Sequence, residues 1–388
     1  MLHPSYIELS KSAYEKNIDF LRKFAGEEVT ISSVIKGNAY GHGIEQFVPM
    51  AEDCGIKHFS VFSADEANRA LLSSQSDADI MIMGWISNDE LPWAIENEVS
   101  FYVFEADRLR AAAEVASNLG KPARIHLQVE TGMHRIGLEA DQLEEAVSII
   151  RDNRSLFSIE GICTHYAGAE SVSNYLRIQN QIKTYRKICD DLRKDDIKPT
   201  YHHTACSAAT LTYPETIMDL VRIGIAQYGF WPSRETFMYY QKNNHHPGQE
   251  EFKDPLNRVM TWKSIVMSTK EVEAGAFVGY GNEYLTNRKQ QIANIPIGYA
   301  HGFARNLSNL GMVLINGARA KVAGRVNMNQ LTIDVTDIPD VKKGDEVVVI
   351  GHQKDQEISV SSFSDLSNNL NYEALTRIPS ELPRYVVE

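Results

Sequence analysis

The chain has 388 residues, of which 43% are hydrophobic and 23% are charged, and its formal net charge is −12. This composition is typical of globular proteins, and the length suggests two or three domains. The acidic balance, with lysines scattered along the chain, argues against a nucleic-acid-binding protein.

The targeting and cysteine signals are also informative. No apolar run approaches the roughly 20 residues that a membrane span needs, and the N-terminus carries charges instead of an apolar signal core. The four cysteines are widely spaced, without a CxxC or a Cys–His ligand pattern. We therefore expect a cytoplasmic protein with reduced cysteines, no membrane contact and no metal site.

Between residues 10 and about 230, short β-branched or aromatic runs alternate with longer amphipathic segments. The runs are VTISSVIK (29–36), KHFSVFS (57–63), DIMIMGW (79–85), VSFYVFE (99–105), RIHLQVE (124–130), IEGICTH (159–165), TYHHTA (200–205) and DLVRIGI (219–225). Helix-like stretches such as 63–74, 105–120 and 139–153 lie between them. Such alternation predicts βα units on a parallel sheet, and about eight units predict a closed (β/α)8 barrel. A doubly wound open sheet is less favoured, because no GxGxxG follows the first strand.

The C-terminal third has a different texture. Residues 231–255 are polar, with Pro and Gly, and are typical of a linker or an exposed excursion. Strand-like runs without long helices then follow, and Asn316 and Gly317 between two of them predict a hairpin. We therefore expect an α/β barrel domain over 10–245 and a mainly antiparallel β domain over 256–388, which also includes residues 1–9.

Chemically capable residues follow several of the predicted barrel strands. In sequence order they are Lys36 after the first strand, Arg135 after the fifth, His165 at the end of the sixth, Cys206 and Ser207 after the seventh, and Arg222, Gly224 and Ile225 after the eighth. Active sites of (β/α)8 barrels lie at the C-terminal ends of the strands. We therefore expect these residues around one mouth.

Lys36 is the residue on which the chemistry depends. A lysine desolvated at a strand end has a lowered pKa and becomes an amine nucleophile, which suits imine formation with an aldehyde cofactor such as pyridoxal 5′-phosphate (PLP). Ser207 and the backbone N–H groups near Gly224 and Ile225 could bind its phosphate at a helix N-terminus. Position alone leaves open a surface lysine whose charged end reaches solvent.

Seven motifs carry a family resemblance. VIKGNAYGHG, ETGMHRIG, HHTACSAAT, VRIGIAQYG, VGYGNEY, IGYAHGF and GRVNMNQ resemble, in the same order, the motifs of PLP-dependent alanine racemases. The resemblance covers nearly the whole chain. It implies a PLP-binding barrel followed by a β domain, in a head-to-tail homodimer whose active sites are shared between subunits.

The resemblance also implies residue roles. Lys36 matches the lysine that binds PLP covalently, and Tyr280 matches the second acid–base residue, which is donated across the dimer. The other cofactor positions are Tyr40, Ser207, Gly224 and Ile225 at the phosphate, Arg222 at the pyridine nitrogen, and His165 beside Arg222. Arg135 and the backbone of Met328 match substrate-binding positions, and Tyr299 and Arg305 match the substrate entrance.

These residue types suit racemisation, because inverting an α-carbon requires proton removal on one face and proton return on the other. Burial would lower the pKa of Lys36 but raise that of Tyr280, so we expect neighbouring cations such as His165 and Arg222 to correct the latter. A guanidinium does not give up its proton, so Arg222 would leave the pyridine nitrogen unprotonated and limit side reactions.

The chain departs from the family pattern at five positions. Cys206 replaces asparagine, Gln128 replaces a lysine that many members carbamylate, His301 and Asn329 replace aspartates, and Ser380 replaces a tyrosine. Substrate is therefore less determined than reaction. A broad-specificity or non-alanine racemase acting on serine, lysine or an acidic amino acid is one alternative, and a PLP-binding homologue without turnover is another.

Other readings of the same residues stay open at this point. Without the motif, Tyr280 could be a packed aromatic, His165 a satisfied barrel histidine, and Arg135 a surface ion-pair partner. Related decarboxylases carry a cysteine motif in the β domain, whereas no cysteine follows Cys206 here. PLP carriers without catalysis are usually single barrels, which the predicted β domain disfavours.

Overall fold

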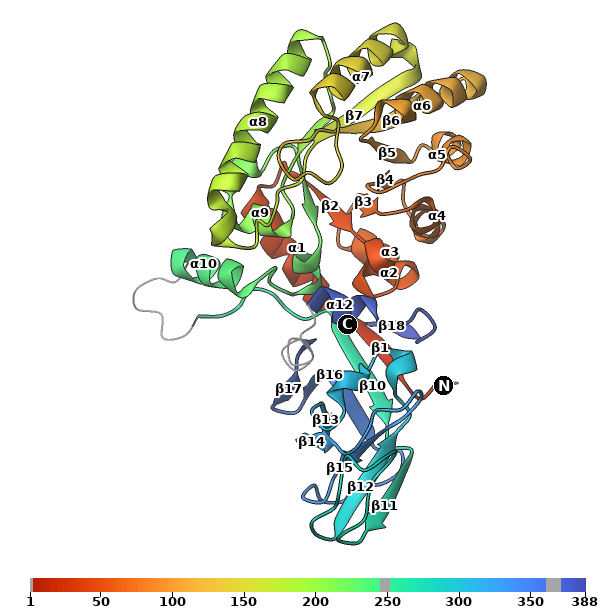
Figure 1. The fold of residues 1–388 in the computed structure, drawn as a ribbon, viewed down its shortest axis with the longest axis vertical. Coiled ribbons are helices and arrows are strands. Elements are labelled where there is room, and N and C mark those ends of the chain that lie inside the picture. The colour runs from red at the N-terminus through yellow and green to blue at the C-terminus, as the bar shows by residue number, and fades with distance from the viewer. Residues whose placement is uncertain (1–2, 245–251, 361–370) are drawn as a thin grey trace. The chain divides into compact units, whose positions relative to one another are not determined.

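The computed structural model describes residues 3–244, 252–360 and 371–388, and the chain divides into two compact units (Figure 1). The barrel unit comprises Ala13–Lys36 and Val48–Asn257. The β unit comprises Met1–Ser12, Gly37–Phe47 and Arg258–Glu388. The short segment Gly37–Phe47 therefore packs with the β unit, although barrel residues flank it in the sequence.

Eight parallel strands form the barrel, in the order β8-β7-β6-β5-β4-β3-β2-β9. They are β2 Thr30–Val34, β3 His58–Val61, β4 Asp79–Ile82, β5 Ser100–Val103, β6 Ala123–Gln128, β7 Phe157–Cys163, β8 Tyr201–His203 and β9 Leu220–Ile223. The first and last of them pair directly, and the ring closes between β8 and β9 through the Arg222 N–H, which donates to the Ala205 carbonyl at 2.9 Å. The predicted barrel is confirmed, and the open-sheet alternative is wrong because its sheet would have two free edges.

Helices alternate with these strands, as the sequence pattern predicts. The helices of the described residues are α1 Lys11–Ala25, α2 Lys36–Tyr40, α3 Ile44–Asp53, α4 Ala64–Ser73, α5 Leu91–Glu96, α6 Ala106–Leu119, α7 Ala140–Asp152, α8 Tyr175–Lys194, α9 Ser207–Thr212, α10 Arg234–Asn244 and α12 Asn371–Thr376. Short 3-10 turns are η1 Arg154–Leu156, η2 Val172–Asn174, η3 Pro214–Thr216, η4 Ile225–Tyr228, η5 Tyr299–His301 and η6 Arg305–Leu307.

Helix α6 shows why these segments form helices. Its buried side chains recur at intervals of three and four residues, which places one apolar stripe against the sheet. The helix ends at Gly120, which has a φ of 63° and closes the last turn through its N–H to the Ala116 carbonyl.

The excursion over 231–255 differs from the predicted linker, because residues 234–244 form helix α10. Tyr240 on this helix lies 5.0 Å from the Trp231 ring and 5.5 Å from the Phe20 ring of α1, measured between centroids. The average composition of residues 231–255 is polar, which favours a linker. Tyr240 nevertheless packs into an aromatic cluster that forms only in the folded chain. Residues 245–251 lie outside the described residues.

The β unit contains one mainly antiparallel sheet, in the order β11-β12-β15-β14-β13-β16-β10-β1-β18, with β17 paired to β16. Its strands are β1 Tyr6–Ser10, β10 Met260–Ile265, β11 Ser268–Val272, β12 Gln290–Ile295, β13 Met312–Ile315, β14 Ala318–Val322, β15 Leu331–Asp334, β16 Glu346–Gln353, β17 Gln356–Ile358 and β18 Arg384–Val387. The hairpin between β13 and β14 is confirmed: Asn316 and Gly317 form its two-residue turn, with φ values of 53° and 81°.

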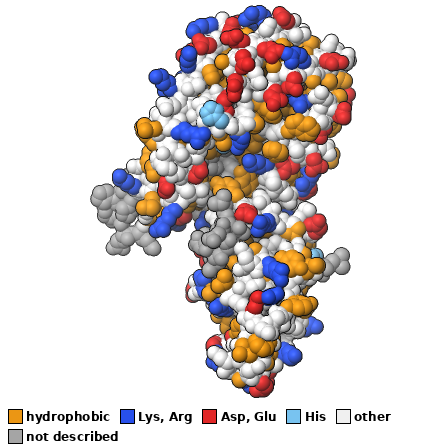
Figure 2. Space-filling model, in the orientation of Figure 1, with side chains coloured by type: hydrophobic (Ala, Val, Ile, Leu, Met, Phe, Trp, Pro, Cys, Tyr) orange, Lys and Arg blue, Asp and Glu red, His pale blue; other side chains and the backbone are white. Residues whose placement is uncertain are grey.

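The helices and the charged surface are the features that bear on membrane and nucleic-acid binding. Over residues 3–244, 252–360 and 371–388, no helix is both long and apolar enough to cross a bilayer. On the face of the barrel unit that Figure 2 shows, basic and acidic side chains are interspersed and do not gather into one basic patch.

Candidate active site

The predicted barrel residues do lie at the C-terminal ends of the strands. Lys36 follows β2, Arg135 lies in the loop after β6, His165 follows β7 by two residues, and Ser207 begins α9 after β8. One placement differs from the prediction: Arg222 lies within β9 and not after it. Its side chain is therefore fixed by a strand.

An unusual turn follows Lys36. Gly37, Asn38, Ala39 and Tyr40 all have left-handed backbone conformations, with φ between 51° and 63°. A left-handed conformation costs roughly 1–2 kcal/mol for each residue that carries a Cβ. Local hydrogen bonds oppose this cost, among them the Gly43 N–H to the Asn38 carbonyl at 2.9 Å. Three consecutive residues that carry a Cβ, Asn38, Ala39 and Tyr40, are thus held in a strained conformation just after Lys36, a feature that clusters at ligand-binding sites.

The Lys36 amine is tuned toward nucleophilic chemistry. Its side chain remains accessible to solvent. Partial desolvation lowers the pKa of Lys36 below its ordinary value, and the positive charge of Arg135 lowers it further. A larger fraction of the amine is consequently unprotonated near neutral pH than in an isolated lysine.

Three predicted phosphate-site residues lie together in the barrel unit. The Ser207 hydroxyl oxygen accepts from the Gly224 N–H at 2.9 Å, and Ile225 begins the turn η4 directly after Gly224. Since the oxygen of Ser207 is engaged by Gly224, the hydroxyl proton is the group available to an anion. Tyr40 belongs to the β unit and is buried there, with its ring 5.9 Å from that of Tyr372.

Arg222 is buried and almost fully hydrogen-bonded to the barrel. Its Nη1 donates to Nδ1 and to the carbonyl of His203, both at 2.7 Å. Its Nη2 donates to the carbonyls of Thr164 and Thr204, at 2.8 and 3.1 Å. A guanidinium has five N–H groups, so these four bonds leave the Nε–H to meet a ligand.

His165 is neutral, and the expectation that it acts as a cation is wrong. Burial lowers the pKa of His165 to about 3, and the positive charges of Arg222, Arg135 and Lys36 contribute to the lowering. A protonated His165 would be a desolvated positive charge close to the positive charges of Arg222, Arg135 and Lys36, which is unfavourable. Of the two proposed corrective charges, only Arg222 remains.

Arg135 is held by an organised loop. The carboxylate of Glu130 accepts from the backbone N–H groups of residues 132–134, and Arg177 donates to the Gly132 carbonyl at 2.9 Å. Partial burial favours a raised pKa for Glu130, but these N–H groups outweigh it and lower the pKa. The loop is thereby closed by an ionised carboxylate at neutral pH.

The positions that depart from the family pattern have definite surroundings. Gln128 is buried, and its Nε2 donates to the Ile136 carbonyl at 3.2 Å, directly beside Arg135. His301 is half-buried, and its Nδ1 accepts from the Gly298 N–H of the same turn at 3.1 Å. Cys206 precedes helix α9, Asn329 is exposed, and the Ser380 carbonyl accepts from Arg384 at 3.0 Å.

Tyr280 lies in a glycine-flanked turn of the β unit. Gly279 and Gly281 on either side have φ of 75° and 73°, a region that favours glycine. The Tyr280 side chain is 70% exposed, so it is not the packed aromatic that its sequence context alone would suggest. The nearby Tyr284 is different, because its hydroxyl is held by Asp334 at 3.3 Å and by Gln290 at 3.0 Å.

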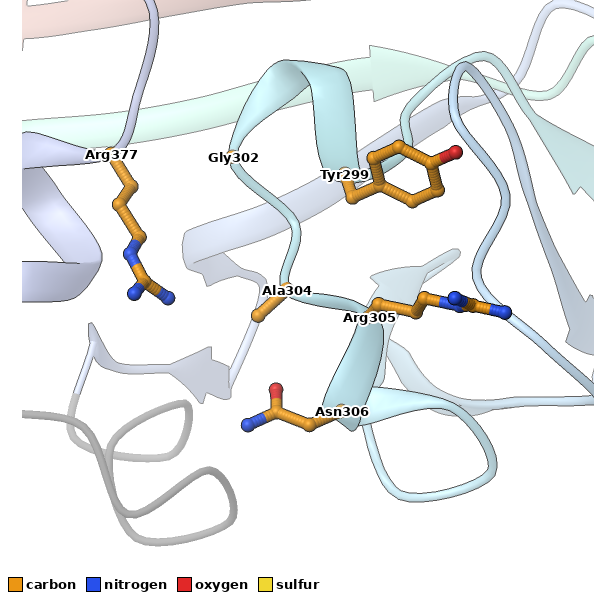
Figure 3. A pocket seen from close by; sticks show the side chains of 6 residues that line it. All are labelled: Tyr299, Gly302, Ala304, Arg305, Asn306 and Arg377. Carbon is orange, nitrogen blue, oxygen red and sulfur yellow. The ribbon is translucent and has the colours of Figure 1, made fainter.

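Two further predicted residues, Tyr299 and Arg305, line one cavity of about 350 Å³ in the β unit (Figure 3). The Tyr299 hydroxyl and the Arg305 guanidinium lie on one side, and the Arg377 guanidinium and the Asn306 amide lie on the other. Arg377 and Asn306 were missed at the sequence level, because neither falls in a motif with a known role. Arg377 is ion-paired with Glu373 on α12.

Met328 lies beside this cavity wall through backbone contacts. Its carbonyl accepts from the Ala300 N–H at 3.0 Å, and the Tyr299 N–H donates to the Asn327 carbonyl at 3.0 Å. Gly298 permits this approach, since a Cβ there would lie 2.1 Å from the Asn327 carbonyl oxygen. The side chain of Met328 is 56% exposed.

The donor set of the barrel fits PLP. It contains an accessible amine of lowered pKa, a hydroxyl whose proton is available to a phosphate, and a buried guanidinium whose Nε–H is left over. An aldehyde, a phosphate ester and a ring nitrogen that accepts a hydrogen bond match these three features in turn.

Comparison with known proteins agrees with this reading. Residues 9–232 match the N-terminal domain of alanine racemases, and residues 259–386 match the C-terminal domain. The alanine racemase of Leptospira interrogans is 32% identical over 386 residues, covering 100% of this chain and 96% of the relative. That of Desulforamulus reducens is 34% identical over 390 residues, covering 100% of both.

Solved structures give the same result. The crystal structure of alanine racemase from Bacillus anthracis with bound L-Ala-P has a TM-score of 0.89 and 30% identity, covering 100% of this chain and 96% of that one. Alanine racemase from Streptomyces lavendulae has a TM-score of 0.89 and 29% identity, covering 100% and 98%.

Proposed function

The chain belongs to the alanine racemase family, and from this premise we propose that it interconverts L- and D-alanine with PLP, using Lys36 and Tyr280 as the two proton-transfer groups. The observation that carries the assignment is the combination of a lysine of lowered pKa at one barrel mouth with an exposed phenol in the β unit. PLP, when bound, supplies an aldehyde that captures the substrate amine and a conjugated ring that acidifies the α-C–H.

Each proton-transfer residue serves one face of the substrate carbon. The Lys36 amine can remove or return the α-proton on its own face of the substrate. The Tyr280 phenol performs the same exchange on the opposite face. Because the two groups are distinct, the proton removed and the proton returned can come from different residues, which is what inversion requires.

The remaining barrel residues hold the cofactor. Ser207 donates its hydroxyl proton to the phosphate, with Tyr40 and the backbone N–H group of Ile225, while the Gly224 N–H holds the Ser207 oxygen at 2.9 Å. Arg222 offers its Nε–H to the ring nitrogen and, as a group that keeps its proton, leaves that nitrogen unprotonated. Arg135 binds on the phenolic side of the ring, and the Met328 N–H binds the substrate carboxylate, since its carbonyl already accepts from Ala300.

Tyr280→Phe tests the chemistry. General acid–base residues contribute roughly 10²–10⁴-fold, so racemisation should fall by about that factor while PLP absorbance is retained. Exchange of the α-proton with deuterated water should persist for one enantiomer, because the lysine face remains. The matched control is Tyr284→Phe, which removes a phenol held within the β unit and should keep near-normal activity. Equal activity of both variants would refute the role of Tyr280.

We further propose that the active unit is a homodimer in which the partner subunit's Tyr280 completes the site around Lys36. The proposal is supported by three exposed side chains of the β unit, which another subunit could cover: Tyr280 is 70% exposed, Met328 56% and Tyr299 43%. Co-expression of Lys36→Ala with Tyr280→Phe tests this directly. A symmetric shared site gives about one quarter of wild-type activity, because half the molecules are mixed and each has one intact site. No recovery would refute sharing.

Substrate range is the remaining question. A panel of L-alanine, L-serine, L-lysine and L-glutamate with added PLP separates an alanine-specific enzyme from a broad one. The neutral Asn329 and the Arg305 guanidinium at the cavity favour entry of acidic amino acids. D-Alanine made in the cytoplasm would supply bacterial cell-wall synthesis.

A further inference from the structure

A continuous hydrogen-bond chain crosses the barrel interior from Arg222. The Arg222 Nη1 donates to His203 Nδ1 at 2.7 Å, and His203 Nε2 lies 3.0 Å from His126 Nδ1. His126 Nε2 lies 3.2 Å from the Ser100 hydroxyl, which in turn donates to the Ile80 carbonyl at 3.2 Å. The four side chains are each at most 5% exposed, so water does not compete for these bonds.

Both ends of this chain impose the same direction on its protons. Arg222 can only donate, so His203 Nδ1 must accept, which places the proton of His203 on Nε2. That proton is donated to His126 Nδ1, so the proton of His126 is also on Nε2. From the other end, the single hydroxyl proton of Ser100 goes to the Ile80 carbonyl, so Ser100 must accept from His126. The tautomers deduced from the two ends agree.

The contact between the two imidazoles depends on a glycine. His126 lies on β6 and His203 on β8, and strand β7 runs between them with Gly161 in register with His126. A Cβ at Gly161 would lie 2.3 Å from His126 Nδ1 and 2.7 Å from His203 Nε2. A side chain at this position would therefore separate the rings, so the bond across β7 requires glycine.

Both rings are also neutral. Burial lowers the pKa of His203 well below its ordinary value, with Arg222 as the next cause, and burial does the same for His126, with His58 next. A protonated His203 would present two N–H groups and could not accept from Arg222. The charge of Arg222 consequently faces neutral acceptors only: one imidazole nitrogen and three carbonyls.

We propose that His126 and Ser100, across Gly161, are positioning residues that fix His203 in the acceptor tautomer and thereby hold the Arg222 guanidinium with its Nε–H turned toward the cofactor ring. The consequence for Arg222 rests on the proposed function. The tautomers do not, because the protein residues alone determine them.

The direct test is the protonation state of the imidazoles in the cofactor-free full chain. In protein labelled with ¹⁵N-histidine, long-range proton–nitrogen correlation at pH 7 distinguishes the two tautomers and the imidazolium. The His126→Asn and His203→Asn variants assign the signals by loss. We expect both rings to carry one proton, on Nε2. A proton on Nδ1 of either ring, or a doubly protonated ring, would overturn the proposal whatever reaction the protein catalyses.

The functional test compares two substitutions at one position in the PLP-loaded enzyme. His126→Leu removes the acceptor of the His203 proton, whereas His126→Asn keeps an oxygen acceptor near the Nδ1 position. The readout is pyruvate released per alanine racemised; pyruvate forms when alanine gives its amino group to the cofactor and water supplies the ketone oxygen. We expect about a tenfold rise for His126→Leu, the factor that one lost buried hydrogen bond gives, and a ratio near wild type for His126→Asn.

The possible results separate this inference from the proposed function. Equal ratios in the Leu and Asn variants would refute the positioning role even if the wild type racemises alanine. Failure of the wild type to racemise any amino acid would refute the proposed function, and the tautomer measurement would still decide the structural part. Gly161→Ala gives an independent check, since it should shift the His203 signals as His126→Leu does, while unchanged signals would count against the bond across β7.

Discussion

Replacement of Ser207 by alanine removes one oxygen atom with two separate consequences. The hydroxyl oxygen accepts from the buried Gly224 N–H at 2.9 Å, so its loss leaves that donor unsatisfied, at a cost of about 1–3 kcal/mol in the free energy of unfolding. The hydroxyl proton is proposed to reach the PLP phosphate. A hydrogen bond to a charged group contributes about 1.5–3 kcal/mol, which corresponds to roughly 10- to 100-fold weaker PLP binding.

The two consequences are measured separately. Urea unfolding of the cofactor-free protein reports the Gly224 contact, and absorbance titration with PLP reports the phosphate contact. Thr212→Val is the matched control, since Thr212 ends the same helix and its hydroxyl donates to the carbonyls of Ala208 and Ala169, away from Gly224. PLP affinity of Ser207→Ala within threefold of wild type, together with a lowered urea midpoint, would show that the hydroxyl supports Gly224 alone and would refute the phosphate role.

Three other perturbations have defined outcomes. Gln128→Leu should raise KM for alanine about tenfold with PLP affinity unchanged, because the Ile136 carbonyl beside Arg135 loses its donor; an unchanged KM would argue that Gln128 does not position this loop. Gly298→Ala should likewise raise KM, since its Cβ would collide with the Asn327 carbonyl and displace Met328, and a normal KM would contradict that contact. Stability should fall as the pH drops from 7 to 5: five histidines (His42, His58, His126, His165, His203) have lowered pKa values, so these five side chains bind about five more protons at pH 5 in the unfolded chain than in the folded chain. The urea midpoint as a function of pH measures this, and a flat profile above pH 5 would exclude it.

The fold was predictable to a large extent from the sequence. Strands buried on both faces must be continuous apolar runs, and each must be followed by a helix that covers the sheet, so the alternation over 29–225 indicated the barrel. The hairpin at Asn316 and Gly317 was predictable because few residues adopt left-handed φ at both turn positions. In contrast, helix α10 was not predicted, since its stability depends on packing of Tyr240 against α1 and Trp231.

The candidate site also has features that the sequence determines and features that depend on the tertiary structure. The motifs determined which residue types follow which strands, because the chemistry of an amine, a phenol and a guanidinium does not depend on packing. Protonation states do depend on packing: His165 was expected to be a cation, but burial among three positive charges makes it neutral. The lysine amine, the phenol and the order of βα units were thus determined by the sequence itself. Only the tertiary structure decided that His126 and His203, 77 residues apart, meet across Gly161, because a contact between distant strands depends on register and on the absence of one side chain.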